Sequence, residues 1–181
     1  DLARPYRAIA RGQRQREHAR IGLGRETLQL RQRRRPRFGL RGAGGNFCAG
    51  GDLKDMADAR MRAMHRAEGE PDPMADVNAA FGHLCAAYAN TPLAVVAVLE
   101  GAVMGGGLGL ACVADVAIAG DTAAFRLPET SLGVVPAQIA PFLVERLGYS
   151  QAKRLAVTGG RLDAAGALAV GPVSYTHLTL P

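Results

Sequence analysis

Two glycine-rich segments constrain the fold of this chain more than any other feature. The first covers residues 46–53 (NFCAGGDL), and the second covers 101–108 (GAVMGGGL) and follows an apolar run at 93–99. A strand, a tight glycine turn and a helix start leave backbone N–H groups free and pointing outward. Two such turns can aim one N–H each at a single oxygen, which is what an oxyanion hole requires. The pair therefore predicts an enzyme that acts on a carbonyl compound.

The hydrophobic pattern predicts alternating strands and helices. Residues 93–99 (LAVVAVL) form a continuous apolar run, which is typical of a strand covered on both faces in a layered α/β fold. Apolar residues recur at helical spacing after Pro73, which indicates a helix with a core-facing side. We further expect a helix or a mobile loop at 53–66, helices at 106–114, 138–147 and 151–157, and strands at 116–119 and 123–127.

Composition narrows the class of protein. A length of 181 residues suggests one domain with a sizeable core. Cys48, Cys85 and Cys112 have neither metal-ligand nor CxxC spacing, so we expect small core residues in a reducing cytoplasm and no metal site. Residues 91–114 carry one charge, Glu100, but their glycines and strand-like first half argue against a membrane span.

The basic residues are concentrated at the start of the chain. Residues 1–41 hold 13 of the 22 basic side chains, all of them Arg, and three of the 16 acidic ones. Three interpretations stay open: an arm that binds nucleic acid or an anionic membrane, a solvated disordered tail, or a segment that is not in the natural reading frame. The absence of Lys and of any period favours the reading-frame interpretation over nucleic-acid binding.

Three stretches follow one another in a recognisable order: FCAGGDLKDM (47–56), PLAVVAVLEGAVMGGGLGLACVADVAIA (92–119) and FRLPETSLGVVP (125–136). Together they resemble the enoyl-CoA hydratase/isomerase (crotonase) superfamily. The stretch at 128–148 is similar in particular to isohexenylglutaconyl-CoA hydratases. The resemblance implies an α/β fold, a spiral of repeated β-β-α units, incomplete here at both ends. It also implies a homotrimer or a dimer of trimers for the intact protein.

The same resemblance divides the chain into three parts. It covers a crotonase core fragment at 40–173 and begins abruptly at Leu40, which leaves an Arg-rich segment of doubtful frame at 1–39. We also expect a non-native tail at 174–181, because SYTHLTLP bears no relation to the sequence before it. Family members have an apolar strand that runs directly into Leu40, and we expect this strand to be missing here. We also expect the helical portion that follows the core in the family to be absent.

The resemblance assigns roles to individual residues. It places the two oxyanion-hole donors at the backbone amides of Gly51 and Gly106, and the catalytic acid/base at Glu129. Apolar Leu127, Leu132 and Val134 near Glu129 are expected to remove its hydration and raise the pKa of the carboxyl group, unless this residue only caps a turn. The backbone around Phe47 and Ala49 is where the family contacts the adenine end of coenzyme A. No cofactor is implied beyond the coenzyme A of the acyl-CoA substrate.

One position departs from the family pattern. Hydratases of the family carry a second glutamate in GGGxE, and this chain has Gly109 there. We hypothesise that Gly109 makes room for a branched acyl chain, with Gln138 as an additional polar group near the reacting carbons. The resemblance then favours hydration of a branched enoyl-CoA. Double-bond isomerisation and acyl-CoA binding without catalysis are the alternatives.

Overall fold

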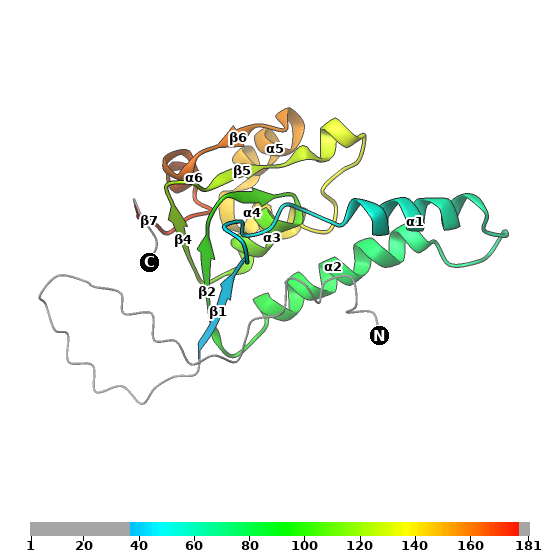
Figure 1. The fold of residues 1–181 in the computed structure, drawn as a ribbon, viewed down its shortest axis with the longest axis horizontal. Helices are drawn as coiled ribbons and strands as arrows, with labels where there is room; N and C mark the ends of the chain where they lie inside the picture. Colours follow the sequence, from blue (N-terminus) through cyan, green and yellow to red (C-terminus); the bar gives the residue numbers. More distant parts are fainter. Residues whose placement is uncertain (1–36, 178–181) are drawn as a thin grey trace, which may run out of the picture.

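Two small sheets form the centre of the molecule (Figure 1). The computed structural model describes residues 37–177, and residues 1–36 and 178–181 lie outside the described part. The first sheet contains, in spatial order and all parallel, β1 (Arg37–Arg41), β2 (Ala94–Leu99), β4 (Val116–Gly120) and β7 (Tyr175–His177). The second contains β3 (Ala102–Met104), β5 (Ala124–Arg126) and β6 (Arg161–Leu162), with β6 antiparallel to β5.

The chain passes alternately through the two sheets, which produces a spiral. After β2 it enters β3 and then helix α3 (Gly106–Val113), and after β4 it enters β5 and the helical segments that follow. Cys48 begins the same pattern one turn earlier, because it forms a parallel bridge with Val103 after the chain leaves β1. The expected spiral of β-β-α units is therefore confirmed.

Strand β1 corrects one expectation. The segment before Leu40 was expected to lack a strand, yet Arg37–Arg41 pairs with β2 along its whole length. A strand needs apolar side chains only at alternate positions. Leu40 is buried and Phe38 packs against the core, while the two arginines face solvent. The sheet thus includes residues from the predicted 1–39 segment, and β7 lies within the predicted 174–181 tail; whether these segments are native stays a prediction.

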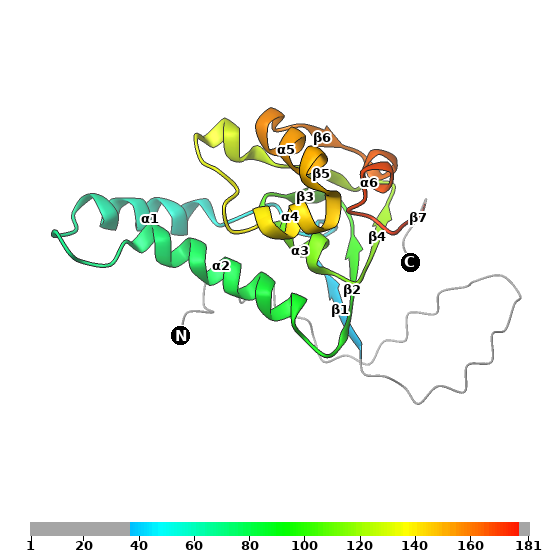
Figure 2. The same cartoon turned by 180° about the vertical axis from the view of Figure 1, so that it is seen from behind.

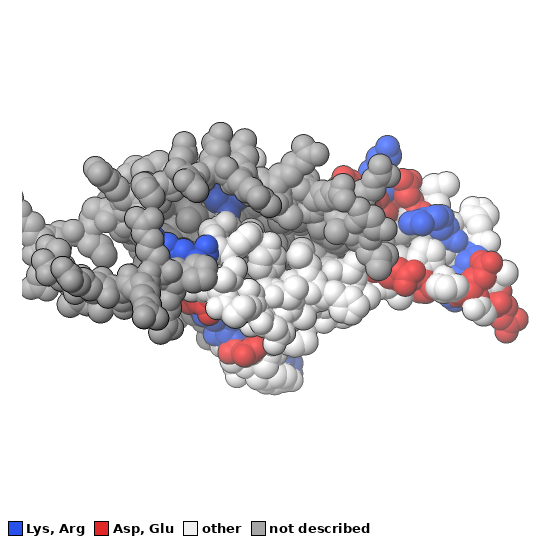
Figure 3. Space-filling model, turned by 90° about the horizontal axis from the view of Figure 1, so that it is seen from below, with Lys and Arg blue, Asp and Glu red and all other residues white. Residues whose placement is uncertain are grey.

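Helices α1 and α2 form a hairpin that extends away from the sheets (Figures 1 and 2). Helix α1 (Leu53–Met64) begins after Asp52, whose carboxylate accepts a hydrogen bond from the Lys54 amide. Asp72 caps α2 (Pro73–Ala89) in the same way. Phe81 is buried on the core-facing side expected for α2. Charged side chains gather at the far end of the hairpin, on the right of Figure 3, while uncharged ones continue toward the middle of the molecule.

Three further helices cover the other side of the molecule. They are α4 (Ala140–Leu147), α5 (Tyr149–Thr158) and α6 (Ala164–Val170), the last of which the sequence pattern does not predict. The 3₁₀-helix η2 (Pro128–Leu132) links β5 to α4. Among the helices of the described residues, none is both apolar enough and long enough to cross a bilayer. The nucleic-acid interpretation of the Arg-rich segment falls mainly on residues outside the described range.

Candidate active site

The first glycine turn is attached to β3 by backbone hydrogen bonds. The Phe47 N–H donates to the Glu100 carbonyl at 2.8 Å and the Cys48 N–H to that of Ala102 at 2.9 Å. In return, the Met104 N–H donates to the Cys48 carbonyl at 2.9 Å. These bonds place residues 47–50 beside the strand that leads into the second glycine turn. Two segments that are far apart in the sequence therefore meet at one place.

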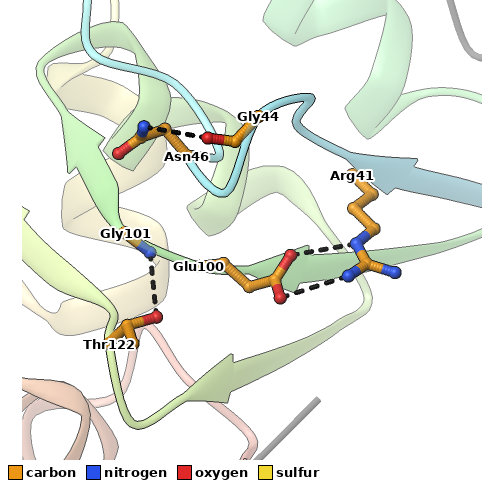
Figure 4. A network of polar contacts seen from close by, with 6 residues as sticks. All are labelled: Arg41, Gly44, Asn46, Glu100, Gly101 and Thr122. Carbon is orange, nitrogen blue, oxygen red and sulfur yellow. Dashed lines mark hydrogen bonds and ion pairs between the residues drawn. The ribbon is translucent and has the colours of Figure 1, made fainter. Parts of the chain in front are cut away.

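Polar side chains strengthen this junction (Figure 4). The Asn46 side chain accepts a hydrogen bond from the Ala102 N–H at 2.9 Å and donates one to the Gly44 carbonyl at 3.4 Å. The Arg41 guanidinium donates to both carboxylate oxygens of Glu100, at 2.9 and 3.1 Å. The one charged residue of the apolar stretch 91–114 thus joins the end of β1 to the start of β3.

The second glycine turn is packed so tightly that it excludes side chains. Gly105 has a φ of 53° and a ψ of −118°, which glycine adopts without strain, and it caps α3. A Cβ atom on Gly106 would lie 2.6 Å from Cζ of Phe81 in α2. A Cβ atom on Gly107 would lie 2.8 Å from Cβ of Cys48 in the first turn. Close packing therefore requires these glycines, whatever their chemical role.

Both expected donor amides lie at helix starts. Gly106 is the first residue of α3, and Gly51 directly precedes Asp52, the N-cap of α1. Neither amide donates a hydrogen bond within the described part of the chain. The partial positive charge of a helix N-terminus favours an anion near such amides. The arrangement can therefore receive negative charge on an oxygen.

The Glu129 carboxyl group lies against the second turn. Its Oε1 is 3.0 Å from the position that a Cβ atom on Gly105 would occupy. Its Oε2 is buried and has no hydrogen-bond partner within the described residues. Burial raises the pKa of this carboxyl group, because the charged form loses hydration. Of the neighbours expected to cause this, Leu127 is buried, whereas Leu132 and Val134 are exposed.

Glu129 was expected in the position of either an acid/base or a turn cap. It lies in the first turn of η2, but no side chain caps that helix. A carboxylate that capped the turn would accept a hydrogen bond from an amide further along the helix, whereas the backbone amide that acts on this carboxyl group is that of Glu129 itself. The unpartnered Oε2 argues for the acid/base, because burial of a polar atom without a partner costs stability and is uncommon in a purely structural role.

Gly109 requires a correction. The hypothesis that it makes room for a branched acyl chain does not fit the packing, because Ile139 fills the adjacent space. A Cβ atom on Gly109 would contact Ile139 Cγ2 and lie 2.8 Å from Ile139 Cβ. Both residues are buried. The place of the family's second glutamate is therefore taken by an apolar side chain and not by open space.

The remaining expected residues occupy distinct places. The Gln138 side chain lies against Gly82 of α2, next to Phe81, and it is half-buried. Phe47 is buried with its N–H already bonded, and Ala49 is exposed. In any main-chain hydrogen bond between Phe47 and coenzyme A, the Phe47 carbonyl oxygen would therefore be the acceptor.

The cysteines are core residues, as expected. All three are free and buried, and burial raises the pKa of Cys85 and Cys112 to about 12. Such thiols are neutral and weakly nucleophilic at physiological pH. Within residues 37–177, no group of three or more His, Cys, Asp or Glu side chains could hold a metal ion.

Three residues near the glycine turns escape sequence reasoning: Asn46, Met56 and Phe81. Asn46 stands in the quoted glycine-rich segment, but its bond to β3 needs the fold to bring the two segments together. Met56 Sδ lies 3.3 Å from the Cβ position of Gly51. The helical pattern marks Phe81 as a core residue, but it does not indicate that the ring contacts Gly106.

Comparison with known proteins places these motifs in a family. The family model for enoyl-CoA hydratase/isomerase matches residues 39–176. A solved enoyl-CoA hydratase/isomerase from Marinobacter aquaeolei is 53% identical, with a TM-score of 0.73 over 80% of this chain and 54% of that chain. Pseudomonas aeruginosa AtuE is 51% identical, with a TM-score of 0.73 over 80% and 53% of the two chains.

Curated relatives agree with the solved structures. The mitochondrial methylglutaconyl-CoA hydratase of Mus musculus is 34% identical over 132 residues, which are 72% of this chain and 39% of that protein. The chain spans about half the length of the curated relatives it matches. The family model and the structural matches agree, and the chain belongs to the enoyl-CoA hydratase/isomerase family.

Proposed function

We propose that this chain carries the acyl-CoA site of an enoyl-CoA hydratase, with Glu129 as acid/base and the Gly51 and Gly106 amides as the oxyanion hole. One observation carries the proposal. The Oε2 atom of Glu129 is buried and has no hydrogen-bond partner within the described residues, and the same carboxyl group lies against Gly105, the residue before Gly106. The amides of Gly106 and Gly51 donate no hydrogen bond within the described residues. A carboxyl group, two free N–H groups and two helix starts at one place suit enolate chemistry.

The proposed reaction adds water across a double bond conjugated to the thioester carbonyl. Attack of water on the β-carbon moves negative charge to the carbonyl oxygen, where two preorganised amides stabilise it by about 3 kcal/mol each. The Glu129 carboxylate takes the proton that the water loses and returns it to the α-carbon. The water oxygen and both hydrogens end on the product, and the carboxylate is regenerated. One glutamate is therefore sufficient for the proton balance.

We propose a branched acyl-CoA thioester as the substrate, with isohexenylglutaconyl-CoA as the specific candidate. Support comes from the resemblance of residues 128–148 and from a relative whose name specifies a methyl-branched acyl group. The packing of Ile139 on Gly109 removes the earlier rationale that space opens there. Gln138 keeps its proposed role as a polar group near the reacting carbons.

Further properties of the intact protein are proposed on the same resemblance. The main chain around Phe47 and Ala49 would contact the adenine end of coenzyme A, with no other cofactor and no metal. The protein would assemble as a homotrimer or a dimer of trimers in the cytoplasm. Size-exclusion chromatography with light scattering would test the assembly, and a monomer at micromolar concentration would contradict it.

Glu129→Gln in the full-length protein tests the assignment. The amide keeps the shape of the carboxyl group but cannot accept a proton from water, so turnover of enoyl-CoA should fall by about a thousandfold. Glu145→Gln is the matched control, because Glu145 is an exposed glutamate on α4. Turnover by Glu129→Gln within a few-fold of the wild type would remove Glu129 from the mechanism.

Isomerisation is a second candidate, favoured by the absence of a second carboxylate at position 109. A single base can move a proton between the α- and γ-carbons, whereas hydration usually employs two carboxylates. Separate incubations with a β,γ-enoyl-CoA and with its α,β-isomer distinguish the reactions. An isomerase converts the first compound into the second, whereas a hydratase leaves the first unchanged and converts the second into a 3-hydroxyacyl-CoA. Binding of a panel of enoyl-CoAs without turnover would instead favour a non-catalytic relative.

A further inference from the structure

The helical hairpin contacts both proposed oxyanion-hole glycines, one with each of its helices. Met56 of α1 places Sδ 3.3 Å from the Cβ position of Gly51. Phe81 of α2 places three ring carbons, Cζ, Cε1 and Cε2, at 2.6 to 3.1 Å from the Cβ position of Gly106. The two helices pack against each other, so a single supersecondary unit contacts both glycines.

The two contacts differ in stiffness. Phe81 is buried, and its ring has two rotatable bonds, so the core fixes its position. Met56 is half-buried and unbranched, and thioether side chains adapt to irregular space. The ring therefore gives Gly106 a rigid support, whereas Met56 gives Gly51 an adjustable one.

We propose that Met56 and Phe81 are positioning residues, and that the α1–α2 hairpin sets the distance and direction between the Gly51 and Gly106 amides. The inference rests on the proposed oxyanion hole. A thioester oxygen is polarised fully only when both amides point at it, and small displacements of such donors cost rate. Residues that never touch the substrate thus determine how strongly the carbonyl is polarised.

Carbonyl polarisation provides a measurement that a purely structural role would not change. The probe is butanoyl-CoA with a ¹³C-labelled carbonyl, a saturated thioester that cannot be hydrated. Binding to the full-length wild-type protein should lower the carbonyl stretching frequency measured by difference infrared spectroscopy. Phe81→Leu, which keeps an apolar core residue, should lose at least half of that lowering and lower kcat about tenfold, with KM changing less than threefold.

The control and the second variant come from the same hairpin. Leu84→Ala in α2 removes partly buried packing. The atoms nearest the Cβ positions of Gly51 and Gly106 belong to Met56 and Phe81, so the carbonyl shift should stay at the wild-type value in this variant. Met56→Ala should lose a smaller part of the shift than Phe81→Leu does. Met56→Leu should keep the wild-type shift, because the leucine side chain fills the space that methionine occupies.

Three results would overturn the inference, and they are distinguishable. A wild-type shift that Phe81→Leu and Met56→Ala both leave unchanged would show that the hairpin does not position the amides, while the proposed oxyanion hole stands. The absence of any shift in the wild-type protein with butanoyl-CoA bound would remove the oxyanion hole itself, and the positioning role with it. Loss of the shift in Leu84→Ala to the same extent as in Phe81→Leu would identify a general packing effect.

Discussion

The two glycine turns look alike in the sequence but differ in how the fold holds them. The turn at Gly50 and Gly51 lies near the surface and is fixed mainly by backbone hydrogen bonds from residues 47 and 48 to the β3 region. The turn at 105–107 is enclosed by the aromatic ring of Phe81, by Cys48 and by the Glu129 carboxyl group. A Cβ atom on Gly51 would therefore meet only the Met56 side chain, whereas Cβ atoms on Gly106 and Gly107 would clash with the Phe81 ring and with Cys48.

This difference assigns separate tasks to the two turns. The second turn fixes an amide in relation to Glu129, because the core leaves no alternative arrangement. In the proposed site, the first turn would supply its amide to the same oxygen, and the flexible Met56 side chain beside Gly51 would let it adjust to the ligand. A rigid donor and an adjustable donor together suit a site that must admit a bulky thioester and still hold its oxygen.

The largest expected effect tests the closed packing behind the second turn. Gly109→Glu would place a side chain where Ile139 lies and would bury a carboxylate that has no compensating partner. The protein should therefore lose several kcal/mol of stability or fail to fold. Gly109→Glu combined with Ile139→Ala should regain folding, as measured by urea unfolding. A stable Gly109→Glu single variant would show that Ile139 moves freely and would break the comparison.

The next effect concerns the rigid donor. Gly106→Ala would drive a methyl group into the Phe81 ring, so kcat/KM should fall about a hundredfold although alanine favours a helix more than glycine does. Gly39→Ala is the matched control, since nothing lies within 4 Å of its Cβ position. Steady-state kinetics with enoyl-CoA measures both variants. Unchanged activity in Gly106→Ala would mean that the second turn is not rigid.

The adjustable donor should respond less. Gly51→Ala meets only the flexible Met56 side chain, with Sδ at 3.3 Å, so kcat/KM should fall by less than about fivefold. The same kinetic assay makes the comparison with Gly106→Ala direct. An equal or larger loss in Gly51→Ala would reverse the assignment of rigid and adjustable turns.

The smallest effect is a pH dependence at Glu129. The pKa of this carboxyl group is raised from 4.5, so the folded state favours its neutral form. The stabilisation is fully present below the pKa of the unfolded chain and is lost as pH rises through the folded-state pKa. Urea unfolding from about pH 4 to about pH 8 should therefore show that Glu129→Gln gains stability relative to the wild type as pH rises. Parallel profiles of the two proteins would contradict the raised pKa.

The sequence predicts the long periodic elements of this fold well. The expected helices at 106–114 and after Pro73 form as α3 and α2, and the apolar run at 93–99 forms β2. Strand β3 escapes prediction because its three residues give no period and are stable only through pairing with β5 and Cys48. Strand β1 was wrongly expected to be missing, because alternate apolar residues between arginines do not resemble a continuous apolar strand.

The candidate site likewise contains residues that the sequence predicts and residues that it does not. Glycine turns and a glutamate can be read from motifs, because backbone geometry and chemistry require those residue types locally. The neighbours of these residues cannot, because the contacts of Gly106 with Phe81 and of Gly109 with Ile139 join helices through tertiary packing. Gly109 illustrates the limit. A small residue in a motif suggested open space, but Ile139, the residue directly before α4, fills that space.

A crystal structure of the full-length protein with butanoyl-CoA tests the central claim most directly. We predict that the thioester oxygen lies about 2.7 to 3.1 Å from both the Gly51 and the Gly106 amide nitrogens, with the Glu129 carboxyl group facing the α- and β-carbons. A thioester oxygen bonded to neither amide, or a Glu129 side chain turned away from the acyl chain, would contradict the account.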